Sequence, residues 1–352
     1  MIRLLFIFLL WPCALQAQEA VALYGPDRDA ASTYMVIEGS TDVTPFTPLL
    51  EAFAAQNPQF AIRYEQWSTN DIYTRAVAAC REGRRSADLV ISSSIDQQVK
   101  LANDGCARRY RSAVTDTLPE WAVWRNEVFG LTREPAVIVY NRDKVPKPDV
   151  PHSRFDLFRL LREPGNRYTG RVATYDIERS GLGYLFAFAD AQQATTFGRL
   201  IETFGRNHAV ATCCSAEIID RVASGEFLIA YNLLGSYALL RAAEDNRIGV
   251  VAPTDYTLLL SRAALIPKSS GNFDGARRFI DFALAPAGRA ALTEGHLIIE
   301  FSGEDGSNSL NLPASSLRPI KFSPVLLVGL DAQKKSLFLE LWRSSVSQIR
   351  SP

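Results

Sequence analysis

The stretch Ala87-Asp88-Leu89-Val90-Ile91-Ser92-Ser93-Ser94 decides the fold of this chain. Its apolar run has the length and composition of a buried strand. The three serines that follow are favoured helix N-caps, and the residues after them, up to Asn103 before Gly105, are expected to be helical. A strand that passes directly into a helix is the basic unit of α/β sheets.

The same strand-to-helix unit recurs along the chain in both directions from this stretch. Further strands are predicted at residues 34–38, 60–64, 136–141, 171–175, 228–232 and 248–252. Helices are predicted at residues 45–57, 73–80, 155–162, 184–189, 218–224, 237–243, 276–284 and 337–346, with Pro286 expected to close the helix at 276–284. This alternation predicts an α/β fold. A length of 352 residues is enough for two lobes with cores of their own.

The first 17 residues have the three-part layout of a secretory signal peptide: a basic start, an apolar run from Leu4 to Trp11, and small residues up to Ala17. The apolar run is shorter than the roughly 20 residues that span a bilayer, which disfavours the alternative of a membrane anchor. Trp11 and Pro12 before Cys13 disfavour a lipoprotein. We expect cleavage after Ala17 and export of a soluble chain.

Charge and histidine content exclude several classes of function. The chain has 38 Lys and Arg against 38 Asp and Glu, so the basic excess of a nucleic-acid-binding protein is missing. A charged ligand must therefore be recognised locally. The chain has three histidines, and none lies at zinc-ligand spacing with a cysteine. We expect no metal, no cofactor and no nucleic-acid partner.

Four of the five cysteines follow residue 17. Cys80 and Cys106 are the pair that could form a disulfide in an oxidising compartment, with free thiols as the equally open alternative. Cys213 and Cys214 are adjacent, and a ring between neighbouring residues is strained. For this pair we expect buried thiols or a redox-labile pair.

Four turns share one design, in which a strand ends, small hydroxyl or glycine residues follow, and a helix begins. They lie at residues 37–41, 91–94, 174–181 and 229–236. Ligands of open α/β sheets bind beyond the carboxyl ends of the strands, where helix N-termini attract carboxylate or phosphate. A single such turn is more often only an N-cap, but four together indicate a site for an anion.

Two kinds of side chain accompany these turns. Five aromatic residues lie in or beside loops, where their rings could form the wall of a cleft: Trp67, Trp124, Tyr140, Tyr231 and Tyr256. Each of them, taken alone, is more often a packing residue. Arg179 precedes Ser180 and Gly181, and its planar fork suits a carboxylate or phosphate. A surface salt bridge is the alternative for Arg179.

The sequence does not favour an enzyme. It contains no Gly-x-Ser-x-Gly elbow, no recognisable pair of acid–base carboxylates and no obvious triad. We therefore predict no catalytic residue. An exported hydrolase is the alternative from another class, and turnover of ester or phosphoester substrates would reveal it.

Six stretches carry a resemblance to a known family. They are Gln66–Asn70, Ala87–Ser94, Glu134–Asn141, Tyr175–Tyr184, Ala230–Tyr237 and the predicted helix Phe279–Arg289 with its ending Ala285–Gly288. These stretches resemble the bacterial extracellular solute-binding proteins of ABC importers, which have the type II periplasmic-binding fold. Within that family the chain is most similar to the branch of iron(III)-type binding proteins and phosphoglycerate transport regulatory proteins.

The resemblance implies two lobes, each a mostly parallel sheet flanked by helices, joined by a hinge. Lobe one would comprise residues 18–134 and 261–352, and lobe two residues 135–260, with crossings near residues 133–136 and 254–265. By position, the cleft would be lined from lobe one by Ser40, Ser93 and Ser94, and from lobe two by Ser180, Gly181, Tyr231 and Asn232. Together with the residues singled out above, the candidate ligand-binding set is Ser40, Thr41, Trp67, Ser93, Ser94, Arg179, Ser180, Gly181, Tyr231 and Asn232.

The resemblance also implies a role. Ferric-binding members of the family hold iron with consecutive tyrosines, whereas here Asn232 follows Tyr231 and no Tyr-Tyr pair occurs in the sequence. This departure favours a small anionic organic ligand, phosphorylated or carboxylated, with ferric iron as the alternative. A monomer in the periplasm would close on the ligand and present it to an ABC permease or to a membrane sensor kinase.

Overall fold

The computed structural model describes residues 18–29, 33–163, 165–193, 195–299, 310 and 314–346. The expected signal peptide at residues 1–17 and the cleavage after Ala17 lie outside these ranges. In the described part of the chain, no helix is both long enough and apolar enough to span a membrane.

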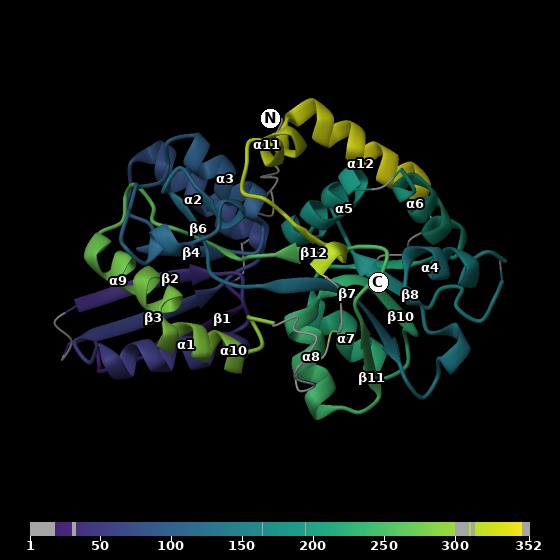
Figure 1. Cartoon of the computed structure of the whole chain (residues 1–352). Helices are drawn as coiled ribbons and strands as arrows, with labels where there is room; N and C mark the ends of the chain where they lie inside the picture. The colour runs from purple at the N-terminus through teal and green to yellow at the C-terminus, as the bar shows by residue number, and fades with distance from the viewer. Residues whose placement is uncertain are drawn as a thin grey trace, which may run out of the picture.

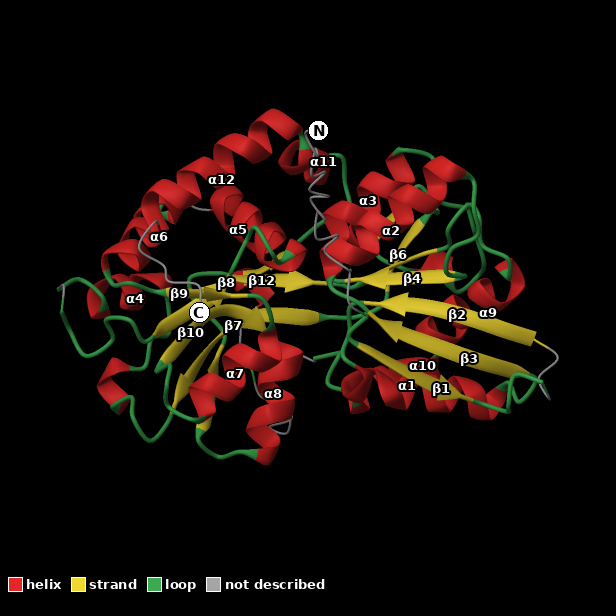
Figure 2. Cartoon of the chain, turned by 180° about the vertical axis from the view of Figure 1, so that it is seen from behind, coloured by secondary structure: helices red, strands yellow, loops and turns green. Residues whose placement is uncertain are grey.

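The strands form two separate sheets, each covered by helices (Figures 1 and 2). The first sheet consists of β1 (Ala20–Tyr24), β2 (Thr33–Gly39), β3 (Phe60–Gln66), β4 (Leu89–Ser92), β5 (Val123–Trp124), β6 (Val128–Gly130) and β13 (Ala263–Leu265). The second consists of β7 (Glu134–Asn141), β8 (Val172–Tyr175), β9 (Val210–Thr212), β10 (Ile229–Leu234), β11 (Ile248–Val251), β12 (Thr257–Leu260) and β14 (Leu317–Pro319). Every strand predicted from the sequence corresponds to one of these.

The helices divide in the same way. Five belong with the first sheet: α1 (Val43–Gln56), α2 (Thr69–Glu82), α3 (Ile95–Asn103), α9 (Phe273–Leu284) and α10 (Pro286–Glu294). Seven follow or lie beside the second: α4 (Arg154–Leu160), α5 (Gly181–Gln193), α6 (Phe197–Arg206), α7 (Ser215–Ala223), α8 (Gly235–Glu244), α11 (Val325–Leu330) and α12 (Ala332–Val346). We call the first sheet with its helices lobe one, and the second sheet with its helices lobe two. The two-lobed α/β fold is thus present as predicted.

The sheets are more mixed than the mostly parallel arrangement expected. In lobe one, β2 pairs in parallel with β3 and β4, but β13 is antiparallel to β4 and β6. In lobe two, β8 is parallel to β9 and β10, whereas β7 is antiparallel to β10, β11 and β12. The parallel strands are those connected through helices, and the antiparallel strands include those next to the crossings between the sheets.

The chain passes from the first sheet to the second between Gly130 and Glu134, and returns between Leu260 and Ala263. These two segments lie side by side, because Leu131 N donates to Arg262 O over 2.8 Å and Arg262 N donates to Thr132 Oγ1 over 2.8 Å. The crossings therefore form one hydrogen-bonded hinge region.

The end of the chain departs from expectation. Residues 261–352 were all assigned to lobe one, but β14 pairs in parallel with β12 of the second sheet. Beyond it, α11 packs against α3 of lobe one while α12 packs against α6 of lobe two (Figure 1). Of residues 314–346, β14 and α12 thus lie on lobe two, whereas α11 packs against lobe one.

Helix boundaries follow local capping chemistry. Ser68 accepts a hydrogen bond from Asp71 N over 3.2 Å at the start of α2, which ends at Gly83 with a left-handed φ of 64°. Pro286 was predicted to close the helix that the structure shows as α9. This helix ends at Leu284, and Pro286 is the first residue of a further helix, α10. Proline is tolerated there because the first helical N–H has no partner within the helix.

Both cysteine pairs are disulfides in the structure. Cys80 and Cys106, with Cα atoms 5.5 Å apart, join α2 to the segment after α3. Cys213 and Cys214 are bonded to each other, and Cys214 is exposed. The expectation of buried thiols for this second pair is therefore wrong, because the pair lies in a turn at the surface between β9 and α7.

Candidate functional site

A cavity lies between the lobes, at the carboxyl ends of β2, β4 and β8. Its empty volume, including the part open to solvent, is about 590 Å³. Lobe one contributes Glu19, Ser40, Asp42, Trp67, Ser68, Thr69 and Ser93. Lobe two contributes Tyr175, Arg179, Ser180, Leu182, Cys213, Cys214, Ser215, Ala216, Leu234 and Tyr237, and the hinge contributes Arg262. Most of the lining residues therefore carry polar side chains, although apolar atoms form the larger part of the exposed lining.

Two strand-end serines form the lobe one wall. Ser40 follows β2 and Ser93 follows β4, and their hydroxyl oxygens lie 3.3 Å apart. Ser93 N donates to Ser40 Oγ over 3.0 Å, and Ser40 N donates to Ile91 O over 3.0 Å. Because β2 and β4 are parallel neighbours, their ends meet at one edge and place both hydroxyls in the cavity.

A buried arginine forms the base of the cavity. Arg262 is fully buried, and its Nε and Nη2 donate to the two carboxylate oxygens of Glu134 over 2.9 and 3.2 Å. Its Nη1 donates to Thr41 Oγ1 over 3.0 Å. Burial alone would lower the pKa of Arg262, but the Glu134 carboxylate reverses this effect and raises that pKa, so the guanidinium stays charged.

Tyr237 connects the two lobes at this base. Its hydroxyl accepts a hydrogen bond from Asp42 N over 3.0 Å, and its ring centroid lies 5.7 Å from the Arg262 guanidinium carbon. Burial raises the pKa of Tyr237 above its ordinary value. Burial likewise raises the pKa of the Asp42 carboxyl, while the nearby Arg262 charge acts in the opposite direction.

The lobe two wall is fixed by Tyr175, the last residue of β8. Its hydroxyl lies 2.5 Å from Ser215 Oγ and accepts from Leu234 N over 3.3 Å. Burial raises the pKa of Tyr175 to about 12. The Ser215 partner is the first residue of α7, so the N-terminus of this helix lies in the wall, next to the Cys213–Cys214 disulfide.

The lobes touch each other at one rim of the cavity. Asn70 Nδ2 donates to Arg179 O over 2.8 Å, and Gly181 N donates to Thr69 Oγ1 over 3.0 Å. A Cβ at Gly181 would lie 2.4 Å from Ser94 Oγ, a separation that real Cβ contacts do not show. Gly181 therefore permits the close approach of α5 to α3, and the structure has the lobes closed on each other at this rim.

The Arg179 side chain is a positive charge at this rim that has no partner among the described residues. Its side chain is exposed, and within the described residues it makes no hydrogen bond or ion pair, so the predicted alternative of a surface salt bridge is not seen. A planar guanidinium without a partner beside a polar cavity can form two parallel hydrogen bonds with a carboxylate or phosphate. This makes Arg179 the residue of the cavity best suited to an anion.

The structure brings together part of the predicted set. Ser40, Trp67, Ser93, Arg179 and Ser180 line the cavity. Three further residues lie directly behind the wall, where their contacts are to protein: Thr41, Ser94 and Gly181.

Tyr231 and Asn232 lie elsewhere, inside lobe two. The Tyr231 hydroxyl donates to Asp190 over 2.6 Å and Asn232 Nδ2 donates to Asp190 over 3.2 Å. Their expected position assumed that the strand ends at residue 232. Instead β10 continues to Leu234 after an irregularity between Ala230 and Leu233, and Leu234 is the β10 residue that lines the cavity.

Several cavity residues were not predicted. Arg262 had a recognisable signal, since it is the one charged residue in the largely apolar run from Thr257 to Ile266, and a cation there must find a buried partner. Thr69 lay within a stretch that carried the family resemblance. Tyr237 also lay within such a stretch, Ala230–Tyr237. Ser215 gave no signal, because its role depends on a contact with Tyr175, which is distant in sequence.

A two-lobed molecule with a polar cavity at its hinge defines a binding protein, and the comparisons identify the family. The family described as bacterial extracellular solute-binding protein matches residues 36–296. This chain belongs to that family.

Individual relatives agree with this assignment. The chain is similar to the substrate binding protein of an ABC transporter from Agrobacterium tumefaciens, with 36% identity and a TM-score of 0.85 over 93% of this chain and 98% of that one. A probable ABC transporter periplasmic-binding protein from Sinorhizobium fredii is 24% identical over 60% of this chain, and the match spans 59% of that relative's length. These relatives are described as binding proteins for transport and not as enzymes.

More distant structures share the fold. AfuA from Actinobacillus pleuropneumoniae, solved with fructose-6-phosphate bound, has a TM-score of 0.72 at 18% identity over 90% of this chain and 99% of that one. Iron-bound HitA from Pseudomonas aeruginosa has a TM-score of 0.66 at 18% identity over 89% and 99% of the two chains. At this identity the likeness concerns the fold alone.

Proposed function

We propose that this protein captures a small anionic organic solute, phosphorylated or carboxylated, in the cavity between its lobes. The observation that carries the proposal is the Arg179 guanidinium, which has no partner among the described residues, beside a hydroxyl-rich wall. Hydroxyls and helix N-termini supply donors to an anion without the cost of burying a further charge.

Binding and closure are coupled in this proposal. A solute that touches Ser40 and Ser93 on one side and Ser180 and Arg179 on the other has contacts to both lobes only when they are closed. Its differential affinity for the closed form then shifts the population toward that form. The hydrogen bonds from Asn70 and Gly181 across the rim support this coupling, because they join the two lobes beside the cavity.

An organic anion is favoured over ferric iron on the chemistry of the cavity tyrosines. Iron held by tyrosine requires phenolates, but burial raises the pKa of both Tyr175 and Tyr237. Both hydroxyls are also engaged in hydrogen bonds to protein groups. The bound fructose-6-phosphate of AfuA is an example of a phosphorylated ligand held by a protein of this fold.

The remaining parts of the proposal concern the cell. Residues 1–17 would be removed on export, and the protein would act as a monomer in the periplasm. It would present its closed face to an ABC permease, in keeping with the described role of the Agrobacterium tumefaciens relative, or to a membrane sensor kinase.

A thermal-shift panel tests the proposed ligand class. Residues 18–352 would be melted with fructose 6-phosphate, 3-phosphoglycerate, citrate and ferric citrate, each in large excess. A true ligand at 100 times its dissociation constant stabilises the protein by about 2.7 kcal/mol. We expect stabilisation by an organic anion, and none by iron once the effect of citrate itself is subtracted.

Two variants locate the site. Arg179→Ala should reduce the shift given by the active compound. Arg206→Ala should leave it unchanged, because Arg206 is an exposed arginine on α6 that does not line the cavity. Equal shifts in both variants would remove Arg179 from the site, and a response to iron but to no organic anion would overturn the ligand class. Turnover of the bound compound would instead support the exported hydrolase.

A further inference from the structure

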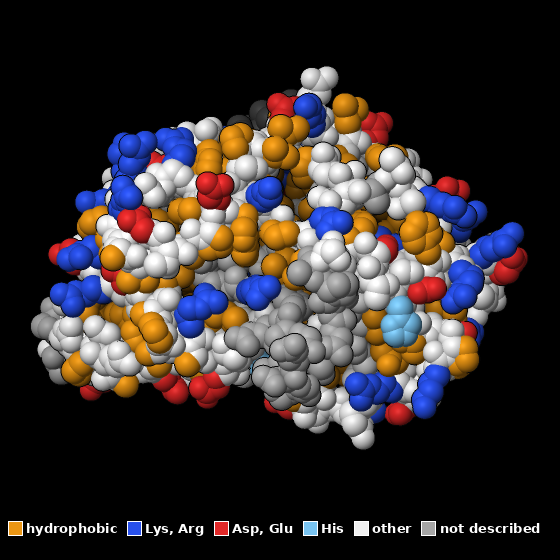
Figure 3. Space-filling model, in the orientation of Figure 1, with side chains coloured by type: hydrophobic (Ala, Val, Ile, Leu, Met, Phe, Trp, Pro, Cys, Tyr) orange, Lys and Arg blue, Asp and Glu red, His pale blue; other side chains and the backbone are white. Residues whose placement is uncertain are grey.

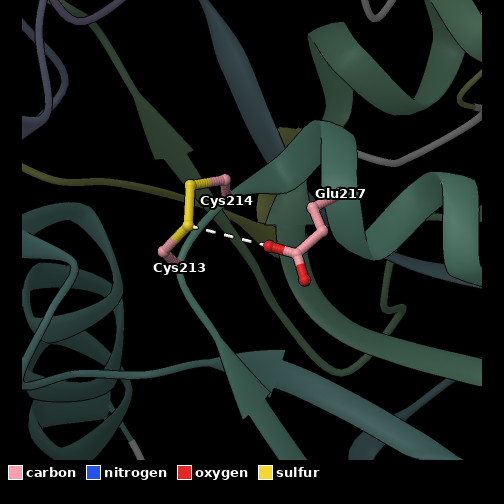
Figure 4. Close-up of side chains that lie close together, drawn as sticks. All are labelled: Cys213, Cys214 and Glu217. Carbon is pink, nitrogen blue, oxygen red and sulfur yellow. Dashed lines mark hydrogen bonds between the residues drawn. A yellow bond between two sulfur atoms is a disulfide. The ribbon is translucent and has the colours of Figure 1, made fainter. Parts of the chain in front are cut away.

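A group of three potential metal ligands lies at the edge of the cavity: Cys213 and Cys214, which line it, and Glu217 beside them (Figure 4). Cys213 Sγ lies 3.8 Å from Glu217 Oε2, and the two sulfur atoms and a carboxylate oxygen all lie within 4.8 Å of one another. Cys214 and Glu217 are exposed, so ions and small reagents reach the group from solvent.

The carboxylate is held toward the sulfur atoms by the first turn of α7. Glu217 is the third residue of α7 and Cys214 is its N-cap residue, so the first turn of the helix brings the carboxylate back toward the cysteine pair. Thr212 Oγ1 donates to Glu217 Oε2 over 2.9 Å and Arg221 Nη1 to Oε1 over 3.3 Å. Glu217 is therefore already oriented beside the sulfur pair.

The disulfide itself has no evident structural task. Cys80–Cys106 closes a loop across a separation of 26 residues, which restricts the unfolded chain, but a bond between neighbours closes almost no loop. Nor does Cys214 act as a side-chain cap: it is the N-cap residue of α7, yet its side chain makes no capping hydrogen bond within the described structure. Serine, threonine, aspartate or asparagine would serve better at that position.

We propose that Cys213, Cys214 and Glu217, after reduction of the disulfide, bind one thiophilic divalent cation at the edge of the ligand cavity. Thiolates are the preferred ligands of such ions, and a carboxylate is an accepted third ligand. The N-terminus of α7 favours the thiolate form. A cation between three negatively charged groups also relieves their mutual repulsion.

The reaction needs a reductant, and an external dithiol is the class that supplies it. The dithiol delivers two electrons and two protons, the Cys213–Cys214 bond breaks, two thiols form, and the dithiol leaves as its own disulfide. Cation binding then releases both thiol protons to solvent. Three protein donors leave a tetrahedral ion one further position, which water or an anion fills.

Cadmium titration tests this site. Residues 18–352 would be treated with dithiothreitol, desalted without oxygen and titrated with CdCl₂, with thiolate-to-cadmium absorbance and calorimetry as the readouts. We expect one Cd²⁺ per chain with release of protons after reduction, none before reduction, and no response to Mg²⁺. Glu217→Gln should weaken binding by about tenfold or more.

Two double variants identify the thiols. Cys80→Ser/Cys106→Ser should keep the cadmium signal, and Cys213→Ser/Cys214→Ser should lose it while its melting temperature confirms that it folds. The proposal is overturned if reduced protein binds no Cd²⁺, or if the signal follows Cys80 and Cys106 instead. Because Cd²⁺ is the only probe, this result is independent of whether the cavity binds an organic anion.

Discussion

Substitution of Gly181 by alanine tests whether the lobes must approach as closely as the structure shows. The added Cβ would lie 2.4 Å from Ser94 Oγ and 2.9 Å from both Asn70 Oδ1 and Gln97 Nε2. An ordinary contact of about 3.5 Å therefore requires the rim to separate by about 1 Å. The Asn70 and Gln97 ends can rotate, but Ser94 is fully buried.

The size of the effect follows from the cost of overpacking. Forcing an extra methyl group into a filled contact costs about 1–3 kcal/mol. Because this contact joins the lobes, the cost falls on the closed form, and solute affinity should drop by about 5- to 150-fold. Folding of each lobe should be unaffected, since alanine favours the first turn of α5 more than glycine does.

Calorimetric titration with the compound that gives the largest thermal shift measures this loss. Gly198→Ala is the matched control, because Gly198 also lies in a helix and a Cβ there meets nothing within 4 Å. Adding Ser94→Ala to Gly181→Ala removes the nearest atom and should restore part of the affinity. The reasoning fails if Gly181→Ala binds as tightly as Gly198→Ala.

Three further outcomes are expected in urea unfolding. Arg262→Ala leaves the Glu134 carboxylate buried without its partner and should cost about 3–5 kcal/mol, whereas Arg262→Met with Glu134→Gln should recover much of this loss. Burial raises the pKa of the Asp96 carboxyl from its ordinary value of 3.8 to about 7. Between pH 4 and 7 the folded protein therefore keeps a proton on Asp96 that the unfolded chain has released, and the free energy of unfolding should fall over this range by roughly 1–4 kcal/mol. Asp96→Asn should make the free energy of unfolding less dependent on pH over the same range. Replacing Cys80 and Cys106 by serine removes a crosslink across 26 residues and should cost about 3.5 kcal/mol, and an unchanged midpoint would exclude this bond as a source of stability.

The predicted strands were found because their apolar runs are short, β-branched and bounded by turn residues, as in Ala136–Asn141. The prediction failed where tertiary contacts overrode local signals. Tyr231-Asn232 has the composition of a strand end, but the irregularity before Leu233 lets β10 continue. Leu317–Pro319 gives no strand signal, since it pairs with β12 only after the chain has returned to lobe two.

The residues of the cavity were likewise predictable only in part. Ser40 and Ser93 were accessible to sequence reasoning because the ends of parallel strands meet at one edge. The contact between Asp42 and Tyr237 joins residues 195 positions apart, and no local pattern encodes it. On the face in Figure 3, Lys and Arg side chains are spread over both lobes, together with Asp and Glu side chains.

Helices α11 and α12 give the molecule a second mechanical linkage. The strand crossings join the lobes on one side, while α11 on α3 and α12 on α6 span them on another (Figures 1 and 2). A rotation that opens the cavity must slide α11 along α3 or bend the chain at Asp331, between the two helices. The contacts of α11 and α12 thus limit how far the lobes can open, in addition to the hinge. A fluorescent reporter fused after α12 would move with lobe two.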